Sequence, residues 1–269
     1  MRKYLAECFP QYPINSITNG VHAVTWMALP FRRLYDCHFP EWRRDNAYLR
    51  YAVSISLDEI QHVHRQAKKV LLREVEQRTD VSLDSSVMTL GFARRATPYK
   101  RADLLFSDLE RLKKIAREVG PVQVIYAGKA HPQDAGGKAL IRRVFQAADA
   151  LGDAVRVVYL EDYNIFLAKL ICSGVDLWLN TPQRPHEASG TSGMKAALNG
   201  IPSLSVLDGW WVEGHVEGVT GWSIEEGPTS GSHRDQEAAS LYDKLESVIL
   251  PLFYRQPDAY ARLCATPSL

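Results

Sequence analysis

Short apolar runs alternate with longer amphipathic segments over the central part of the chain. In the longer segments apolar residues recur three or four positions apart, as on one face of a helix. The short runs are continuously apolar, which is typical of strands in a parallel sheet that is covered on both faces. We expect strands at 87–93, 122–127, 155–160, 175–179 and 203–207. Helices are expected at 102–119, 136–150, 165–172 and 192–199, the last closed by Gly200.

This order of elements predicts an α/β fold with a Rossmann-like parallel sheet and helices on both faces. The crossovers between its strands should be right-handed. No GxGxxG sequence follows the first strand, so a dinucleotide-binding fingerprint is not supported.

Three parts of the chain are predicted from composition and periodicity. Residues 1–45 are rich in proline, aromatic and turn residues, and we expect an irregular segment there. Residues 46–226 form the Rossmann-like domain, which opens with a helix over 46–78. Residues 227–269 comprise a mobile loop of Gly, Pro, Thr and Ser and a C-terminal helix over 242–254, broken at Pro251, which could pack on another domain.

Overall composition excludes several classes of function. The formal net charge is +1, which offers no electrostatic attraction for nucleic acid or an anionic membrane. No apolar stretch is long enough to span a bilayer. The four cysteines are scattered and form no CxxC pair, which argues against a zinc site or a disulfide framework and favours a reducing cytoplasm.

Chemically active residues follow the predicted strands. In a parallel α/β sheet, ligands bind beyond the carboxyl ends of the strands, where these residues should meet. Arg94, Arg95, Lys100 and Arg101 come after the first strand and form a dense basic cluster suited to phosphate.

Residues 187–200, EASGTSGMKAALNG, place one lysine just after a loop of small residues. Such a loop lets backbone N–H groups approach an anion. Desolvation among Met, Ala and Leu would lower the pKa of Lys195 and free its amine to attack a carbonyl. An amine beside an anion cradle is what pyridoxal 5'-phosphate requires, because that cofactor carries an aldehyde and a phosphate.

The segment 187–200 closely resembles the cofactor-lysine motif of the α-glucan (glycogen, starch) phosphorylases. Further segments resemble this family in the same order. They are ITNGVH at 17–22, FARRATPYKR at 92–101, YAGKAHP at 126–132 and LEDYN at 160–164. The variant TSGMK, followed by LDGWWVEG at 207–214, looks like the shorter bacterial and archaeal branch.

The resemblance implies a role for individual residues around the cofactor and the substrate phosphate. Lys195 would bind pyridoxal 5'-phosphate as a Schiff base, with Thr191, Ser192 and Tyr163 around the cofactor. Arg94, Arg95 and Lys100 would hold the substrate phosphate, which makes Lys195, Arg95 and Lys100 candidate catalytic residues.

Four other residues are implied to contact the transferred glucose: Glu187, Ser189, Gly190 and Asn19. A lone histidine, His22, could be a sugar ligand, but a structural role is more usual for such a residue. No pair of carboxylates of the glycosidase kind can be assigned.

The family's reaction is phosphorolysis with retention of anomeric configuration. A terminal glucose of an α-1,4-glucan passes to inorganic phosphate, giving α-glucose 1-phosphate. The resemblance also implies the C-terminal domain of a two-domain glycosyltransferase architecture of the GT-B type. The N-terminal catalytic domain is absent from this sequence, so we interpret the chain as a fragment or a split-gene product that is inactive alone. Apolar surface exposed at the lost interface would favour association into a homo-oligomer.

Two other interpretations stay open at this point. A nucleotide-sugar glycosyltransferase of the same architecture, such as a glycogen synthase, also places a glutamate-containing sugar loop and basic residues at these strand ends, but it uses no pyridoxal phosphate. A truncated remnant that binds sugar or a partner without catalysis is the second alternative.

Overall fold

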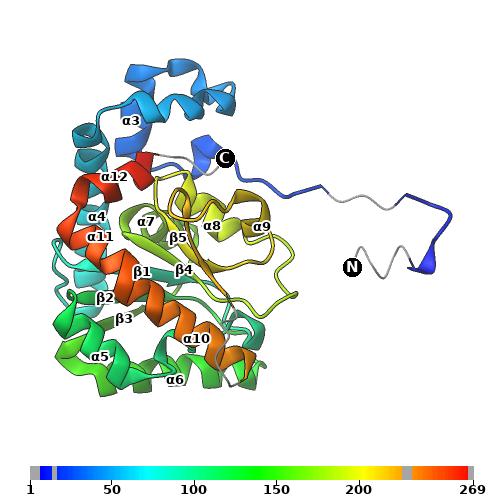
Figure 1. The fold of residues 1–269 in the computed structure, drawn as a ribbon, viewed down its shortest axis with the longest axis vertical. Helices are drawn as coiled ribbons and strands as arrows, with labels where there is room; N and C mark the ends of the chain where they lie inside the picture. Colours follow the sequence, from blue (N-terminus) through cyan, green and yellow to red (C-terminus); the bar gives the residue numbers. More distant parts are fainter. Residues whose placement is uncertain (1–6, 14–16, 226–231, 266–269) are drawn as a thin grey trace.

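The computed structural model describes residues 7–13, 17–225 and 232–265. Its centre is a six-stranded parallel sheet in the order β3-β2-β1-β4-β5-β6 (Figure 1). The strands are β1 Met88–Ala93, β2 Val122–Ala127, β3 Arg156–Leu160, β4 Leu177–Asn180, β5 Ser203–Val206 and β6 Gly221–Ile224. The predicted α/β class and parallel sheet are confirmed. Five strands lie where the apolar runs predict them, whereas β6 is only four residues long and carried no recognisable run.

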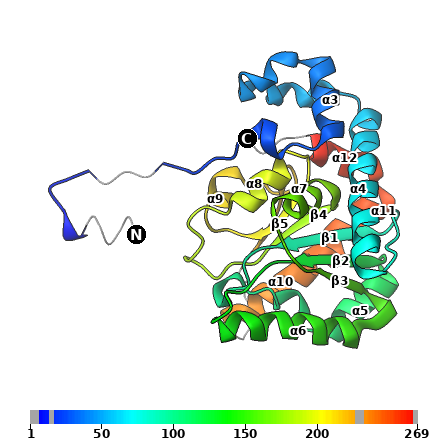
Figure 2. The same cartoon turned by 180° about the vertical axis from the view of Figure 1, so that it is seen from behind.

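Helices cover both faces of the sheet, as predicted (Figures 1 and 2). On one face, residues such as Val124 pack against α5 (Leu109–Glu118), α6 (Ala135–Leu151), α10 (His233–Lys244) and α11 (Leu250–Arg255). On the other face, residues such as Ile125 pack against α4 (Leu57–Thr79) and α7 (Ile165–Gly174). Adjacent strand residues thus enter two different cores, which explains the continuously apolar runs. Within the described part of the chain, no helix combines the length and the apolarity that crossing a membrane demands.

The N-terminal part is more helical than the sequence predicts. Residues 23–38 form α2 (Ala23–Trp26) and α3 (Leu29–His38) instead of irregular structure. In α3 the aromatic residues Phe31 and Tyr35 lie one turn apart and are both buried, so tertiary packing stabilises a helix whose composition suggested turns. The helix predicted over 46–78 is divided into a 3-10 segment, Asn46–Ser54, and α4, whose first turn is capped by the side chain of Ser56.

The C-terminal helix also differs from the prediction, because it is not broken at Pro251. The chain passes from α10 through a π-helical turn, Leu245–Ile249, directly into α11. Pro251 lies in the first turn of α11, and the wider turn before it accommodates the missing N–H. The loop predicted from 227 falls on residues outside the described part, except that Ser232 caps α10.

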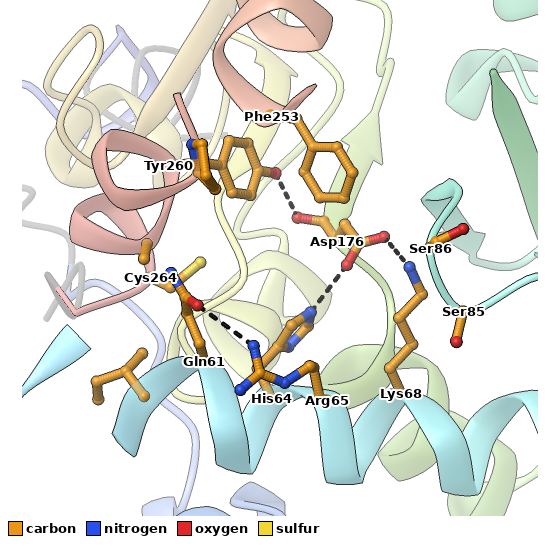
Figure 3. A pocket seen from close by; sticks show the side chains of 13 residues that line it. Gln61, His64, Arg65, Lys68, Ser85, Ser86, Asp176, Phe253, Tyr260 and Cys264 are labelled. Atoms are coloured by element: carbon orange, nitrogen blue, oxygen red, sulfur yellow. Dashed lines mark hydrogen bonds and ion pairs between the residues drawn. The ribbon is translucent and has the colours of Figure 1, made fainter. Parts of the chain in front are cut away.

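A last helix, α12 (Pro257–Ala265), was not predicted, and its buried residues join the core of this chain. Its Tyr260 hydroxyl donates to the backbone oxygen of Asp176 at 2.7 Å (Figure 3). The carboxylate of Asp176 is 3% exposed and accepts from Lys68 at 2.6 Å, from the amide of Thr89 at 2.7 Å and, through its other oxygen, from His64 at 2.9 Å. One buried residue therefore joins α4 and β1 through its carboxylate and α12 through its backbone oxygen, at the start of β4.

Replacing Asp176 by Asn should lower the free energy of unfolding by about 3–5 kcal/mol, because Lys68 would keep a buried charge without its counter-ion. Urea denaturation would measure the loss, with Asp153→Asn as control because the Asp153 side chain is 97% exposed. Burial alone would raise the pKa of Asp176, but Lys68 and His64 outweigh it and hold that pKa below 3.8. The stabilisation should therefore persist above about pH 4 and disappear as the pH falls through the folded-state pKa. Equal stabilities of the two variants would contradict this role.

Candidate functional site

The strand order reverses between β1 and β4. From β1 the chain adds β2 and β3 on one side, and then returns to add β4, β5 and β6 on the other. Such a reversal leaves a crevice at the carboxyl ends of the two central strands, because their following loops turn in opposite directions. Backbone hydrogen bonds tie these loops together, including one from Gln183 to the oxygen of Tyr99 at 2.6 Å.

A buried charged cluster occupies this crevice. The Oε2 atom of Glu187 accepts from Nη2 of Arg94 at 2.5 Å and from Nζ of Lys100. The Nη1 atom of Arg94 donates to the side-chain oxygen of Asn180, the last residue of β4. Burial would raise the pKa of Glu187, but the two cations outweigh it and keep that pKa below its usual value. The carboxylate is therefore charged at neutral pH.

The four cations that follow β1 do not act as one cluster. Only Arg94 and Lys100 reach Glu187. Arg101 is buried and turns away, donating to the backbone oxygens of Thr181 and Pro182 at 2.9 and 2.8 Å and pairing with Glu237 of α10. Arg95 is exposed on the same loop. Consequently two cations face the crevice, one secures the C-terminal helix and one faces solvent.

The loop before α8 (Thr191–Ala197) carries the acidic member of the cluster and is held from β5. The amide of Glu187 donates to the carboxylate of Asp208 at 2.9 Å, and Trp210 donates its own amide to the oxygen of Ser189 at 2.8 Å. Gly190 enters α8 with a φ of 85°, a conformation that favours glycine. Asp208 and Asn180 thus position Glu187 and Arg94. In the sequence, the only sign of this role is that both residues lie at the ends of strands.

Lys195 lies half-buried on α8, with Nζ 3.7 Å from the centre of the Trp26 ring. Burial lowers the pKa of its ammonium group, an effect that the nearby Cys172 opposes. Burial also raises the pKa of the half-buried Tyr163. The nearby Cys172 adds to this increase, whereas the charge of Arg94 opposes it. Tyr163 packs against the apolar core that includes Cys172 of α7 and Ala196 of α8. Trp26 was not expected at the site, because it comes from the segment predicted as irregular.

Two serine hydroxyls of this region lack protein partners. The Oγ atoms of Ser189 and Ser192 are buried and find no hydrogen-bond partner among the described residues. A buried hydroxyl without a partner costs about 1–3 kcal/mol, so these groups are suited to a polar ligand.

The predicted sugar-contacting turn is an exposed segment beside α8. Asn19 borders a cavity of about 420 Å³ that Met194, Trp210 and Glu213 also line. The hydroxyl of Thr18 secures the turn by donating to Glu213 at 2.6 Å. The ring of His22 is 2.7 Å from the hydroxyl of Thr25, a local contact that fits a structural role.

Together, these observations describe an α/β domain with two buried cations and a carboxylate at the switch point of its sheet. Residues 2–221 match the model of the family described as "Carbohydrate phosphorylase". The chain belongs to this family, and the resemblance to phosphorylases is confirmed.

Several curated relatives are similar to the chain. Glycogen phosphorylase of Aquifex aeolicus is 41% identical over 91% of this chain, and maltodextrin phosphorylase of Thermococcus litoralis is 39% identical over 91%. Glycogen phosphorylase of Mycobacterium tuberculosis is 38% identical over 92%. The matched regions cover 39%, 32% and 31% of these relatives, so the chain spans less than two fifths of their length. These matches favour the phosphorylase interpretation over a glycogen-synthase-like transferase.

Arg101 and Arg95 should respond differently to substitution. Arg101→Met should lower the free energy of unfolding by about 3–5 kcal/mol, because it leaves Glu237 as a buried charge without a partner. Arg95→Met, on the exposed side of the same loop, should leave the urea midpoint nearly unchanged. Equal urea midpoints for the two variants would mean that Arg101 has no special structural role.

Proposed function

We propose that this chain forms the cofactor- and phosphate-binding part of an α-glucan phosphorylase. Such an enzyme transfers the terminal glucose of an α-1,4-glucan to inorganic phosphate and releases α-glucose 1-phosphate with retention. The observation that carries the proposal is the half-buried amine of Lys195, for which no carboxylate among the described residues is an ion-pair partner, on the same loop-and-helix segment as two buried hydroxyls without described partners. The names of the relatives, glycogen and maltodextrin phosphorylase, support the substrate class.

The residues around α8 fit pyridoxal 5'-phosphate. Lys195 has a desolvated amine that could react with the aldehyde. The buried hydroxyl of Ser192 has no partner among the described residues and could donate to the cofactor's phosphate. Thr191 begins α8 on the same loop, and Tyr163 would border the ring. When bound, the cofactor would supply a phosphate that exchanges a proton with the substrate phosphate.

Arg94 and Lys100 are the proposed ligands of the substrate phosphate, with Arg95 approaching from the solvent side. Both buried cations are drawn to one oxygen of Glu187 in the structure. A phosphate that enters the crevice would compete for them, and its two or more charged oxygens can accept from both cations. Asn180 would keep the Arg94 guanidinium in place while the anion binds.

Glu187 is the proposed anchor for the glucose hydroxyls, with Ser189, Gly190 and Asn19. Since both cations bind Oε2, the Oε1 atom is available to accept a hydroxyl. The partnerless hydroxyl of Ser189 adds a second polar group on the same loop. A positively charged sugar ring in the transition state would be stabilised by the nearby carboxylate and the phosphate.

Turnover is proposed to need groups beyond this chain, supplied in cis or in trans by a further domain. The three relatives named above are all more than two and a half times as long as the region they share with this chain. We therefore expect the 269-residue chain to bind the cofactor without releasing glucose 1-phosphate from glucan.

Borohydride trapping tests the proposed cofactor site. The purified chain with added pyridoxal 5'-phosphate should acquire an absorbance band, and reduction should leave a stable adduct on the peptide that contains Lys195. Lys195→Ala should lose that adduct, whereas Lys138→Ala, at an exposed position on α6, should retain it. Mass spectrometry of the digested protein identifies the site. A wild-type chain that gives no more adduct at Lys195 than at exposed lysines would refute the proposal.

The pH dependence of this reaction provides a separate prediction. Because burial lowers the pKa of Lys195, its neutral, reactive form should appear at lower pH than in a free lysine side chain. The initial rate of adduct formation at Lys195 should therefore rise with pH about a midpoint below 10.5. N-acetyl-lysine methylamide serves as the reference amine. A midpoint at or above that of the reference would contradict the desolvation argument.

A further inference from the structure

We propose that Trp210 is a positioning residue that holds residues 189–194 in the conformation the cofactor requires. This inference rests on the proposed function. It concerns the sequence LDGWWVEG, whose Trp210 lines the cavity beside Asn19 but has been given no role so far in the binding of cofactor or phosphate.

The indole of Trp210 fills a space bounded by three glycines and is 7% exposed. A Cβ atom on Gly193 would lie 2.9 Å from its Nε1, and a Cβ on Gly190 would lie 3.1 Å from its Cδ1. A Cβ on Gly214 would meet the opposite side of the indole at a still shorter distance. The absence of side chains at these positions is therefore what lets the large ring pack against the first turn of α8.

Trp210 holds the loop through its backbone as well. Its amide donates to the oxygen of Ser189 at 2.8 Å. Across the first turn of α8, the thiol of Cys172 on α7 contacts the oxygen of Ser192 at 3.8 Å. The turn that precedes Lys195 thus lies between the indole and α7, with a fixed contact on each side.

This arrangement has a consequence for ligand binding. The loop places the hydroxyls of Ser189 and Ser192 where no described residue hydrogen-bonds to them, an arrangement that an unsupported loop would relax. Without the indole the loop would have to be ordered when the cofactor binds, and the cost of ordering lowers affinity.

Titration with pyridoxal 5'-phosphate tests the inference on the 269-residue chain. Trp210→Ala should weaken binding by about tenfold or more, which corresponds to about 1.4 kcal/mol. Trp210→Phe, which retains an aromatic ring, should lose less, and both variants keep the backbone amide. Trp42→Ala removes a fully buried tryptophan from the Pro40–Arg43 turn and controls for general destabilisation. It should lower the melting temperature while leaving affinity within about twofold.

A second pair of variants tests the contact itself. Gly193→Ala should weaken cofactor binding in the wild-type background, because its methyl group meets the indole. In the Trp210→Ala background the same change should have little further effect, so the two substitutions should be non-additive. Additive effects would overturn the inference, and so would Trp210→Ala binding as tightly as wild type. If Trp210→Ala does not fold, Trp210→Phe replaces it in both comparisons.

Hydrogen exchange separates this inference from the proposed function. In the chain without cofactor, amides of residues 189–194 should exchange faster in Trp210→Phe than in wild type, whereas in Trp42→Ala their rates should change no more than those of the other sheet-edge loops. Faster exchange together with no cofactor binding by wild type would support the positioning role and refute the proposed ligand. Unchanged exchange with normal wild-type binding would refute only the role of Trp210.

Discussion

Parallel pairing of β1 with β4 is the constraint on which the site depends. These two central strands are joined in register at Leu90 with Leu177 and at Gly91 with Trp178. Their sequence separation is large, and the chain completes β2 and β3 before β4 is added beside β1. The pairing puts Arg94, just after β1, against Asn180 at the end of β4. Any shift in this register would separate the cations from Glu187, because each loop starts at the end of its own strand.

The two ends of β4 hold different kinds of buried charge. At its start, Asp176 is saturated by Lys68, His64 and a backbone amide, so its role is to join elements. Beyond its end, the Oε2 atom of Glu187 accepts hydrogen bonds from both Arg94 and Lys100, so the Oε1 atom is left as a further acceptor. A saturated carboxylate stabilises a fold, whereas one with a remaining acceptor in a crevice can bind a ligand. The same distinction separates Arg101, which is fully engaged with Glu237 and two carbonyl oxygens, from Arg94.

Glycine and aromatic residues have complementary roles around α8. Small residues at the start of the helix allow close approach of the Trp210 indole. On the other side, the Trp26 ring covers the Lys195 ammonium, and this contact reduces its exposure to water without providing a counter-ion. The lysine is consequently held by packing, as the proposed covalent chemistry requires.

Much of the fold and the family could be predicted from the sequence alone. Continuous apolar runs are a local property of strands buried on both faces, so β1 to β5 were recognised, and the residues after each strand had to share one edge. The four-residue β6 and the helices α2, α3 and α12 were missed, since their stability comes from distant packing, as with Tyr260 against Asp176. Only the tertiary structure decided which basic residue faces which carboxylate. Arg94, Arg95 and Arg101 are the same residue type in one loop, so the sequence cannot tell their roles apart. Their environments differ because the partners Asn180, Glu187 and Glu237 come from remote parts of the chain.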